Sequence, residues 1–261
     1  MPQRPGRNAR ASTVSNRTGE TDTALLQPAR SAPALALLAL LLLAPASPAN
    51  AQSVRYEVWP EIDIYVKLGD RFRFVWIGSF NQDQDEKNRE GAFNYFLEFA
   101  LRPVFRRELR DQEDVFRRRF LTFRAGYQYS TSLAAGDSRS ENRAIAESTA
   151  KYPLGAGFVV LDRNRGEFRF LKGKPFSMRY RNRLTVERDV RLRRLVCTPY
   201  AYGEIYYDTQ YSAWNQYRYA FGLQFPAGAH VVVEPYVLRQ HDTRSEPRLV
   251  NALGLTLNLY F

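Results

Sequence analysis

Apolar and polar residues alternate with a period of two over most of the chain, and this period predicts β-strands rather than helices. In residues 58–68 the even positions are apolar, whereas Glu61 and Asp63 occupy odd positions. The end of the chain repeats the pattern, with leucine at every second position from Leu253 to Leu259. Eleven such runs occur, near residues 54–68, 71–80, 92–104, 118–130, 142–152, 157–170, 176–188, 196–208, 214–225, 229–240 and 249–261.

Turn-forming residues separate these runs, as expected where strands reverse direction. Examples are Gly69-Asp70, Gly136-Asp137 and Pro226-Ala227-Gly228. A soluble β-sandwich or lipocalin-like barrel would bury its apolar face against itself. A transmembrane barrel does the reverse, because its apolar residues face lipid and its charged residues face the bore. The alternation alone is compatible with both arrangements.

The first 51 residues contain the three parts of a secretory signal peptide in order. Residues 1–31 carry five arginines, residues 34–44 form an apolar run, and Ala49-Asn50-Ala51 is a small-residue cleavage site. The apolar run is shorter than the roughly 20 helical residues of a membrane span, which argues against an uncleaved anchor. We therefore expect a signal peptide, residues 1–51, cleaved after Ala51, and one barrel domain, residues 52–261.

Charged residues of both signs occupy alternate positions in the middle of several predicted strands. Such a pattern suits a narrow polar bore, in which opposite charges pair across neighbouring strands. A solvated face of a soluble sheet would also be charged, so this feature favours the transmembrane barrel without deciding it. The residues that we expect to line the bore are Arg163, Arg165, Glu167, Arg169, Arg179, Arg181, Arg183, Glu187, Glu204, Arg218 and Glu234.

The chain ends on an apolar strand whose last residues are Tyr260 and Phe261. Soluble domains more often end on polar residues that fray. The ending resembles the sorting signal of bacterial outer-membrane barrels, so we expect this strand to engage the barrel-assembly machinery. Together with the signal peptide and the strand period, it predicts a protein of the bacterial outer membrane, in contact with outer-membrane lipids.

The length of the mature chain limits the number of strands. Its 210 residues accommodate ten to twelve strands of about ten residues with their turns. Single-chain bacterial barrels have an even number of strands. We therefore expect an all-β fold, an antiparallel up-and-down transmembrane barrel with twelve strands.

Composition excludes several classes of function. The formal charge of +11 falls to +8 when the leader is removed, because the leader carries five basic and two acidic residues. The arginines are spread at strand spacing rather than gathered in a patch, so we expect no nucleic-acid partner. Two histidines and one cysteine leave few metal ligands, and no phosphate loop or nucleotide motif occurs, so we expect no cofactor.

One loop near the end of the chain brings together the residue types of a hydrolase. His241, Asp242 and Ser245 are close in sequence, and a lipid-modifying enzyme of the outer membrane could use such groups. A catalytic triad is defined by geometry, however, and adjacent residues of a strand point to opposite faces. We therefore expect a polar loop and no enzyme. Cys197 shares the apolar parity of its run, which predicts an inert thiol.

A series of short motifs in fixed order resembles the Gram-negative family called domain of unknown function 2490. The resemblance covers essentially the whole mature chain, is strongest from Arg143 onward, and implies an outer-membrane β-barrel. It supplies no substrate and no catalytic residue. The motifs are Asp162-Arg163-Asn164-Arg165-Gly166-Glu167, Arg179-Tyr180-Arg181-Asn182-Arg183-Leu184, Pro199-Tyr200, Glu204, Tyr206-Tyr207-Asp208, Asn215-Gln216-Tyr217-Arg218, Pro235-Tyr236, Arg239-Gln240 and the run from Asn251 to Phe261.

Two functions remain open from these observations. The excess of arginine in the bore would favour small anionic solutes in a narrow channel. Alternatively, arginine and glutamate neutralise one another and fill the lumen, which would give a closed structural or ligand-binding barrel. The lipid-modifying enzyme is a third possibility.

Overall fold

Strands account for nearly all of the computed structural model, which describes residues 54–83, 89–101, 120–134, 139–192, 195–244 and 248–261. The expected signal peptide, residues 1–51, lies outside the described residues. A single 3-10 turn, Gly155–Gly157, precedes β6. The strands are β1 (Val54–Lys67), β2 (Phe72–Asp83), β3 (Arg89–Leu101), β4 (Leu121–Ser132), β5 (Ser140–Pro153), β6 (Phe158–Leu171), β7 (Ser177–Arg188), β8 (Val190–Leu192), β9 (Leu195–Asp208), β10 (Ala213–Pro226), β11 (Val231–Asp242) and β12 (Leu249–Tyr260).

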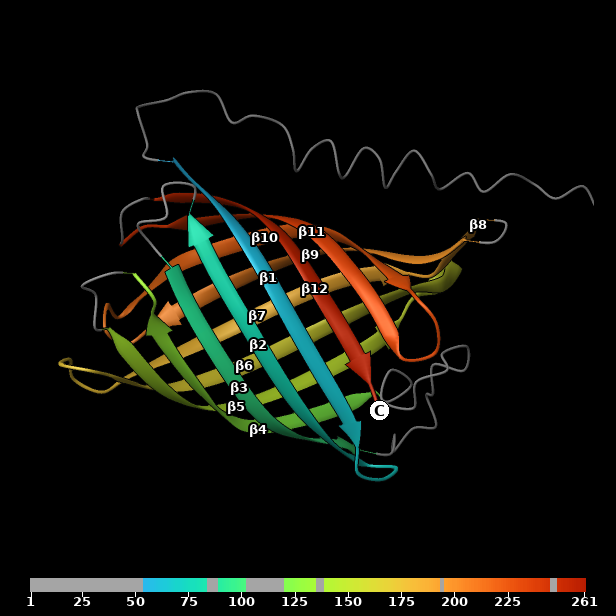
Figure 1. The fold of residues 1–261 in the computed structure, drawn as a ribbon, viewed down its shortest axis with the longest axis horizontal. Helices are drawn as coiled ribbons and strands as arrows, with labels where there is room; N and C mark the ends of the chain where they lie inside the picture. The colour runs from blue at the N-terminus through green and yellow to red at the C-terminus, as the bar shows by residue number, and fades with distance from the viewer. Residues whose placement is uncertain (1–53, 84–88, 102–119, 135–138, 193–194, 245–247) are drawn as a thin grey trace, which may run out of the picture. The chain divides into compact units, whose positions relative to one another are not determined.

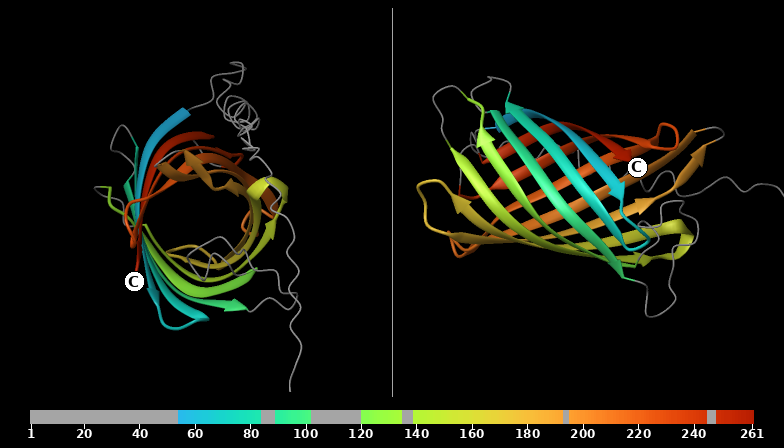
Figure 2. Two further views of the ribbon diagram at one scale, coloured as in Figure 1. Left: turned by 90° about the vertical axis from the view of Figure 1, so that its right-hand side faces the viewer. Right: turned by 60° about the horizontal axis from the view of Figure 1, so that its bottom comes forward.

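Eleven of these strands form a closed barrel (Figures 1 and 2). Every neighbouring pair in the wall is antiparallel except β1 and β12, which run parallel and close the ring. An odd number of strands requires this, because the first and last strands of an alternating series then point the same way. The short strand β8 lies outside the ring and pairs with β9 alone among the described strands.

The strand pattern confirms the expected all-β up-and-down barrel, whose pairs are antiparallel except for β1 with β12. Each of the eleven period-two runs corresponds to one strand of the wall, within three residues at either end. The total of twelve strands agrees with the expected number, although the twelfth is β8, a three-residue strand outside the wall. The wall itself has eleven strands, whereas single-chain bacterial barrels have an even number. The parallel pairing of β1 and β12 allows a ring with an odd number of strands to close.

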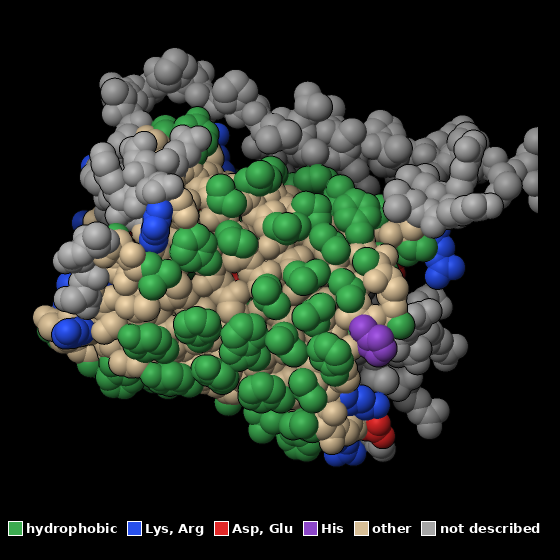
Figure 3. Space-filling model, viewed as in Figure 1, with side chains coloured by type: hydrophobic (Ala, Val, Ile, Leu, Met, Phe, Trp, Pro, Cys, Tyr) green, Lys and Arg blue, Asp and Glu red, His purple; other side chains and the backbone are tan. Residues whose placement is uncertain are grey.

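The two faces of the wall differ sharply in chemistry. The outer face is apolar and aromatic, with exposed side chains such as Phe93 and Leu97 on β3 and Leu253 and Leu255 on β12 (Figure 3). The buried side chains include many carboxylates and guanidinium groups, and Glu167 is fully buried. Large apolar side chains thus cover the outside of the barrel, and most of its charges lie within, beside a small buried apolar cluster of Val75, Phe96 and Ile145. Within the described ranges, no helix is long and apolar enough to cross a membrane.

We call the end of the barrel at which β1 begins the N-terminal rim, and the end at which β12 finishes the C-terminal rim. Because β1 and β12 are parallel, Val54 and Tyr260 lie at opposite rims. The β6–β7 and β9–β10 turns are at the N-terminal rim, and the β1–β2 and β10–β11 turns are at the C-terminal rim.

Candidate functional site: a charged bore

A ladder of alternating charges crosses five neighbouring strands on the inner face of the wall. Strand register places Arg73, Glu98, Arg124, Glu147 and Arg165 opposite one another in turn, from β2 to β6. Glu98 accepts a hydrogen bond from Arg124 and forms an ion pair with Arg73, whose Nη2 lies 2.8 Å from its Oε1. Glu147 accepts one from Arg165 Nε at 2.6 Å. Because facing opposite charges stabilise strand pairing, this ladder helps to fix the register of half the barrel.

Two pairs of arginines face each other across β6 and β7, where like charges would destabilise the sheet. Arg163 is opposite Arg183, and Arg165 is opposite Arg181. The carboxylate of Glu204 on β9 offsets this repulsion, since its oxygens lie 2.6 Å from Arg163, 3.0 Å from Arg181 and 2.9 Å from Arg183. The Glu204 side chain has no exposed surface, so these guanidinium groups provide the compensation that its buried charge requires.

A second group of ion pairs lies nearer the N-terminal rim and is centred on Arg169. Its Nε donates to Glu141 at 2.5 Å and its Nη1 to Asp208 at 2.7 Å. Arg143 donates to Glu141 at 2.7 Å, and Arg179 donates to Asp208 at 2.9 Å. Asp208 is fully buried, so the two arginines that bind it also shield it from water.

Glu167 links the two groups of ion pairs into one network. Arg181 Nη1 donates to Glu167 at 2.8 Å, and Arg143 Nη1 lies 3.7 Å from the other carboxylate oxygen. The buried ring of Tyr206 supports the centre of the network, with the guanidinium of Arg181 4.7 Å from its centroid and that of Arg218 5.1 Å away. Continuous ion pairs therefore run along one side of the bore from β2 to β9.

The opposite side of the bore is acidic. Glu61 and Asp63 on β1 and Glu234 on β11 form a cluster that we call the acidic seam, because it lies where β1 and β12 close the barrel. Register places Thr256 of β12 opposite both Glu61 and Glu234, so the three side chains form a row. Asn258, two residues along β12, faces Asp63.

Neutral groups supply the hydrogen bonds of the acidic seam. The Tyr65 hydroxyl donates to Asp63 at 2.9 Å, and the Tyr200 hydroxyl donates to Glu234 at 2.6 Å. Gly222 makes the second contact possible, because a Cβ at this position would lie 2.4 Å from the Tyr200 ring. Within the described part of the chain, no arginine or lysine nitrogen lies within 4.0 Å of the three seam carboxylates.

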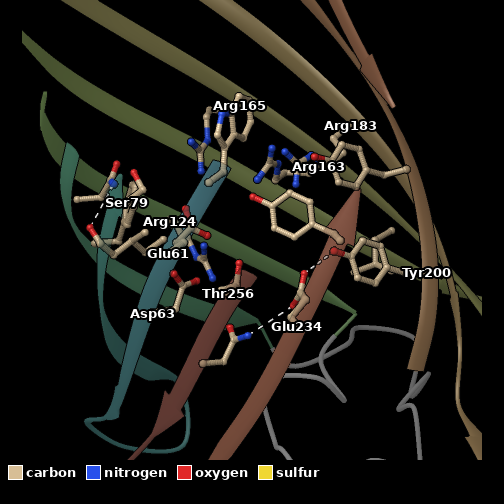
Figure 4. A pocket seen from close by; sticks show the side chains of 18 of the residues that line it. Glu61, Asp63, Ser79, Arg124, Arg163, Arg165, Arg183, Tyr200, Glu234 and Thr256 are labelled. Atoms are coloured by element: carbon tan, nitrogen blue, oxygen red, sulfur yellow. Dashed lines mark hydrogen bonds between the residues drawn. The ribbon is translucent and has the colours of Figure 1, made fainter. Parts of the chain in front are cut away.

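Three cavities follow one another along the bore. The largest of the three, about 470 Å³, separates the acidic seam from Arg163, Arg165 and Arg183, which we call the arginine wall (Figure 4). A cavity of about 400 Å³ opens at the N-terminal rim and shares Arg143 with the central one. A third, of about 260 Å³, lies toward the C-terminal rim and shares the Arg163 and Arg183 lining. The shared residues show that the cavities adjoin.

The structure places all eleven expected bore residues on the inner face of the wall. Eight of them meet in the network of close ion pairs, and Arg218 approaches it with Nη1 3.9 Å from Glu204. Glu234 belongs to the acidic seam instead, and Glu187 lines the cavities on the C-terminal side. The eight are Arg163, Arg165, Glu167, Arg169, Arg179, Arg181, Arg183 and Glu204.

Sequence reasoning missed the first half of the network and most of the acidic seam. Glu61 and Asp63 were visible as polar positions of an alternating strand, yet nothing in the sequence places β1 beside β11. That proximity depends on the closure of the barrel through β12. The missed network residues share the inward parity of their strands, which is the signal that could have identified them: Arg73, Glu98, Arg124, Glu141, Arg143 and Glu147.

The residue types of a hydrolase are not brought together among the described residues. His241 lies opposite Tyr217 and stacks on its ring at 4.7 Å, on the outer face. Asp242 follows at the end of β11 with the inward parity, and Ser245 lies outside the described residues. Cys197 is buried opposite Val190 of β8. Among the described side chains, no cluster of His, Cys, Asp and Glu could hold a metal ion.

The two carboxy-terminal residues close the last strand against β1. Tyr260 points inward and stacks on Tyr65, with ring centroids 4.7 Å apart. Phe261 is exposed, and its amide donates to the Tyr65 carbonyl at 2.8 Å. The Phe261 carbonyl accepts from Lys67 at 2.8 Å. The end of the chain is thus held in the seam by backbone hydrogen bonds.

Comparison with known proteins identifies one family. The family model described as protein of unknown function (DUF2490) matches residues 56–251, from β1 to the start of β12. No curated protein and no solved structure matches the chain.

Proposed function

The chain belongs to the DUF2490 family of proteins of unknown function, and from this premise we propose that it is an outer-membrane barrel with a narrow passage for small anionic solutes. The observation that carries the proposal is the sequence of three adjoining, charge-lined cavities inside a wall whose outer face is apolar. In this proposal residues 1–51 direct export and are removed.

The outer face supports a position in a membrane. An apolar exterior of this extent is unfavourable in water, whereas lipid-facing strands require it. Aromatic pairs gather toward both ends of the wall, as in the aromatic girdles of membrane barrels. Trp214 packs against Tyr180 and Tyr207 near the N-terminal rim, and Phe72 packs against Phe99 near the C-terminal rim.

The balance of charge in the bore supports a preference for anions. Nine basic side chains and four acidic ones line the central cavity among the described residues. An excess of positive charge in a pore lining attracts anions and raises the barrier for cations. The lining of the cavity is also mostly polar, and it shares residues with the neighbouring two, which favours occupation by water and small ions.

Single-channel recording in planar lipid bilayers tests the proposal. We expect the purified protein to conduct, with anions carrying more current than cations. Replacing Arg181 and Arg183 by alanine should raise the conductance and reduce the anion preference, because both side chains narrow the central cavity. Arg239→Ala is the matched control, since Arg239 lies opposite outward-facing Tyr219. A protein that inserts but never conducts would refute the channel.

A closed lumen is the second candidate, and the density of the ion-pair network favours it. Buried arginines that bind carboxylates on both sides act as a fixed plug rather than a gate. In that case the barrel would be structural or bind a ligand, and the arginine replacements would destabilise the fold without producing current. The same recordings, combined with a measurement of unfolding, separate the two candidates.

A further inference from the structure

The central cavity has opposite charges on opposite walls (Figure 4). The arginine wall comes from β6 and β7, and the acidic seam comes from β1 and β11. A cavity of about 470 Å³ separates them, and each wall keeps polar atoms that the protein does not use. A ligand that satisfied both walls would have to carry both signs of charge.

The acidic seam lacks a cation. Asp63 is 6% exposed, and its Oδ1 has no hydrogen-bond partner among the described residues. Its neighbours Glu61 and Glu234 bring two further carboxylates to the same side of the cavity. Buried charges are stable when they are paired or neutralised. An ammonium group, with three donors, would meet this requirement at the seam.

The arginine wall keeps nitrogen atoms that its carboxylate partners, Glu147 and Glu204, do not bind. Glu204 holds Arg163 and Arg183 through one terminal nitrogen each, and the buried Nε of both remains without an acceptor among the described residues. Arginine presents its donors in a planar fork that fits carboxylate and phosphate groups. Because both side chains line the cavity, their guanidinium groups are suited to one small oxyanion there.

We propose that the central cavity binds a small zwitterion, with its ammonium group at Glu61, Asp63 and Glu234 and its carboxylate or phosphate group at Arg163, Arg165 and Arg183. The inference rests on the proposed function and extends its solute class from simple anions to solutes that carry an ammonium group beside the carboxylate or phosphate. A simple anion would leave the seam carboxylates unpaired, and a simple cation would be repelled by the arginines of the opposite wall. Only the zwitterion gains at both walls, and it lies across the bore axis.

Isothermal titration calorimetry on the full mature protein in detergent micelles tests this binding. The probes are L-serine, N-acetyl-L-serine, which has lost the ammonium charge, and L-serinamide, which has lost the carboxylate. We expect each charge-deleted analogue to bind about tenfold more weakly than L-serine. The loss of a hydrogen bond to a charged group weakens binding by about this factor or more. Equal binding of L-serine and N-acetyl-L-serine, or no binding of L-serine, overturns the proposal.

Substitutions locate the site within the bore. Asp63→Asn and the triple change Glu61→Gln, Asp63→Asn and Glu234→Gln should weaken L-serine binding by about tenfold or more and leave N-acetyl-L-serine binding the same or stronger. Glu90→Gln is the matched control, since Glu90 lines the rim cavity outside the central one. Unchanged L-serine affinity in a folded Asp63→Asn protein contradicts the assignment.

Binding in micelles and conduction in bilayers are separate readouts. A protein that conducts anions but does not distinguish L-serine from its analogues retains the proposed channel and loses the zwitterion site. A protein that binds L-serine selectively and never conducts keeps the site and loses the channel.

Discussion

At the scale of single residues, Glu204 holds the most concentrated set of interactions in the bore. Its carboxylate lies within 3.0 Å of Arg163, Arg181 and Arg183 and accepts a hydrogen bond from Tyr206 at 2.8 Å. Arg163 and Arg183 face each other directly, so the sheet at this point depends on the negative charge of Glu204.

Glu204→Gln should destabilise the barrel by about 3–5 kcal/mol, because the change leaves buried guanidinium groups without their counter-charge. Urea unfolding of the protein in micelles, followed by tryptophan fluorescence, measures the loss. Asp70→Asn is the control, since Asp70 is in an exposed turn and its pair with Lys67 at 3.5 Å is worth about 1 kcal/mol or less. Equal stability of the two variants would show that Glu204 is not the centre of the network.

At the scale of strands, adjacent residues of β12 test the orientation of the wall. Leu255 is on the outer face and is 51% exposed, while Thr256 is buried and faces the bore between Glu61 and Glu234. A cationic side chain should therefore be tolerated at Thr256 and should destabilise the inserted barrel at Leu255.

Leu255→Arg should reduce insertion into lipid vesicles, since arginine on the lipid face near the midplane costs about 2–4 kcal/mol. Thr256→Lys places its charge beside two carboxylates and should insert normally. Insertion is measured by the shift in mobility of the folded barrel on an unheated gel. The orientation of the wall is refuted if Leu255→Arg inserts as well as the unchanged protein.

The carboxy-terminal strand gives a second prediction at this scale. If Phe261 is part of the sorting signal, its deletion should lower the amount of barrel assembled in the outer membrane of cells, while refolding of the purified chain into micelles is retained. The deletion removes two backbone hydrogen bonds to β1, which alone would weaken closure slightly. Membrane fractionation of both forms at equal expression measures the effect, and equal assembly would exclude a sorting role for Phe261.

The sequence predicted the strands better than their closure. Period-two alternation is a local property, so runs such as 157–170 and 196–208 match β6 and β9 almost residue for residue. The same alternation assigned Arg163, Arg181 and Glu204 to the inner face of the wall. Parity does not determine how the ring closes, and the parallel pairing of β1 with β12 joins residues about 200 positions apart. The acidic seam follows from that pairing and was therefore not foreseen as a cluster.

At the scale of the whole molecule, the parallel closure divides the bore into two unlike halves. Antiparallel strands from β2 to β9 bring arginine and glutamate into alternating ladders. The seam of β1, β12 and β11 carries carboxylates that pair with neutral groups. We expect this asymmetry to create a field across the bore; in the proposed function, that field steers small charged solutes and orients those with two charges.

The central claim is that the apolar face of the barrel lies against lipid and the charged face encloses the bore. The three tryptophans of the chain lie on both faces: Trp59 lines the central cavity, whereas Trp76 stacks on Phe93 of the outer face. Single-tryptophan variants, with phenylalanine at the other positions, can therefore be compared in vesicles whose acyl chains are brominated. The fluorescence of Trp76 should be strongly quenched by the brominated lipid and that of Trp59 spared. Quenching of Trp59 with protection of Trp76 would contradict the account.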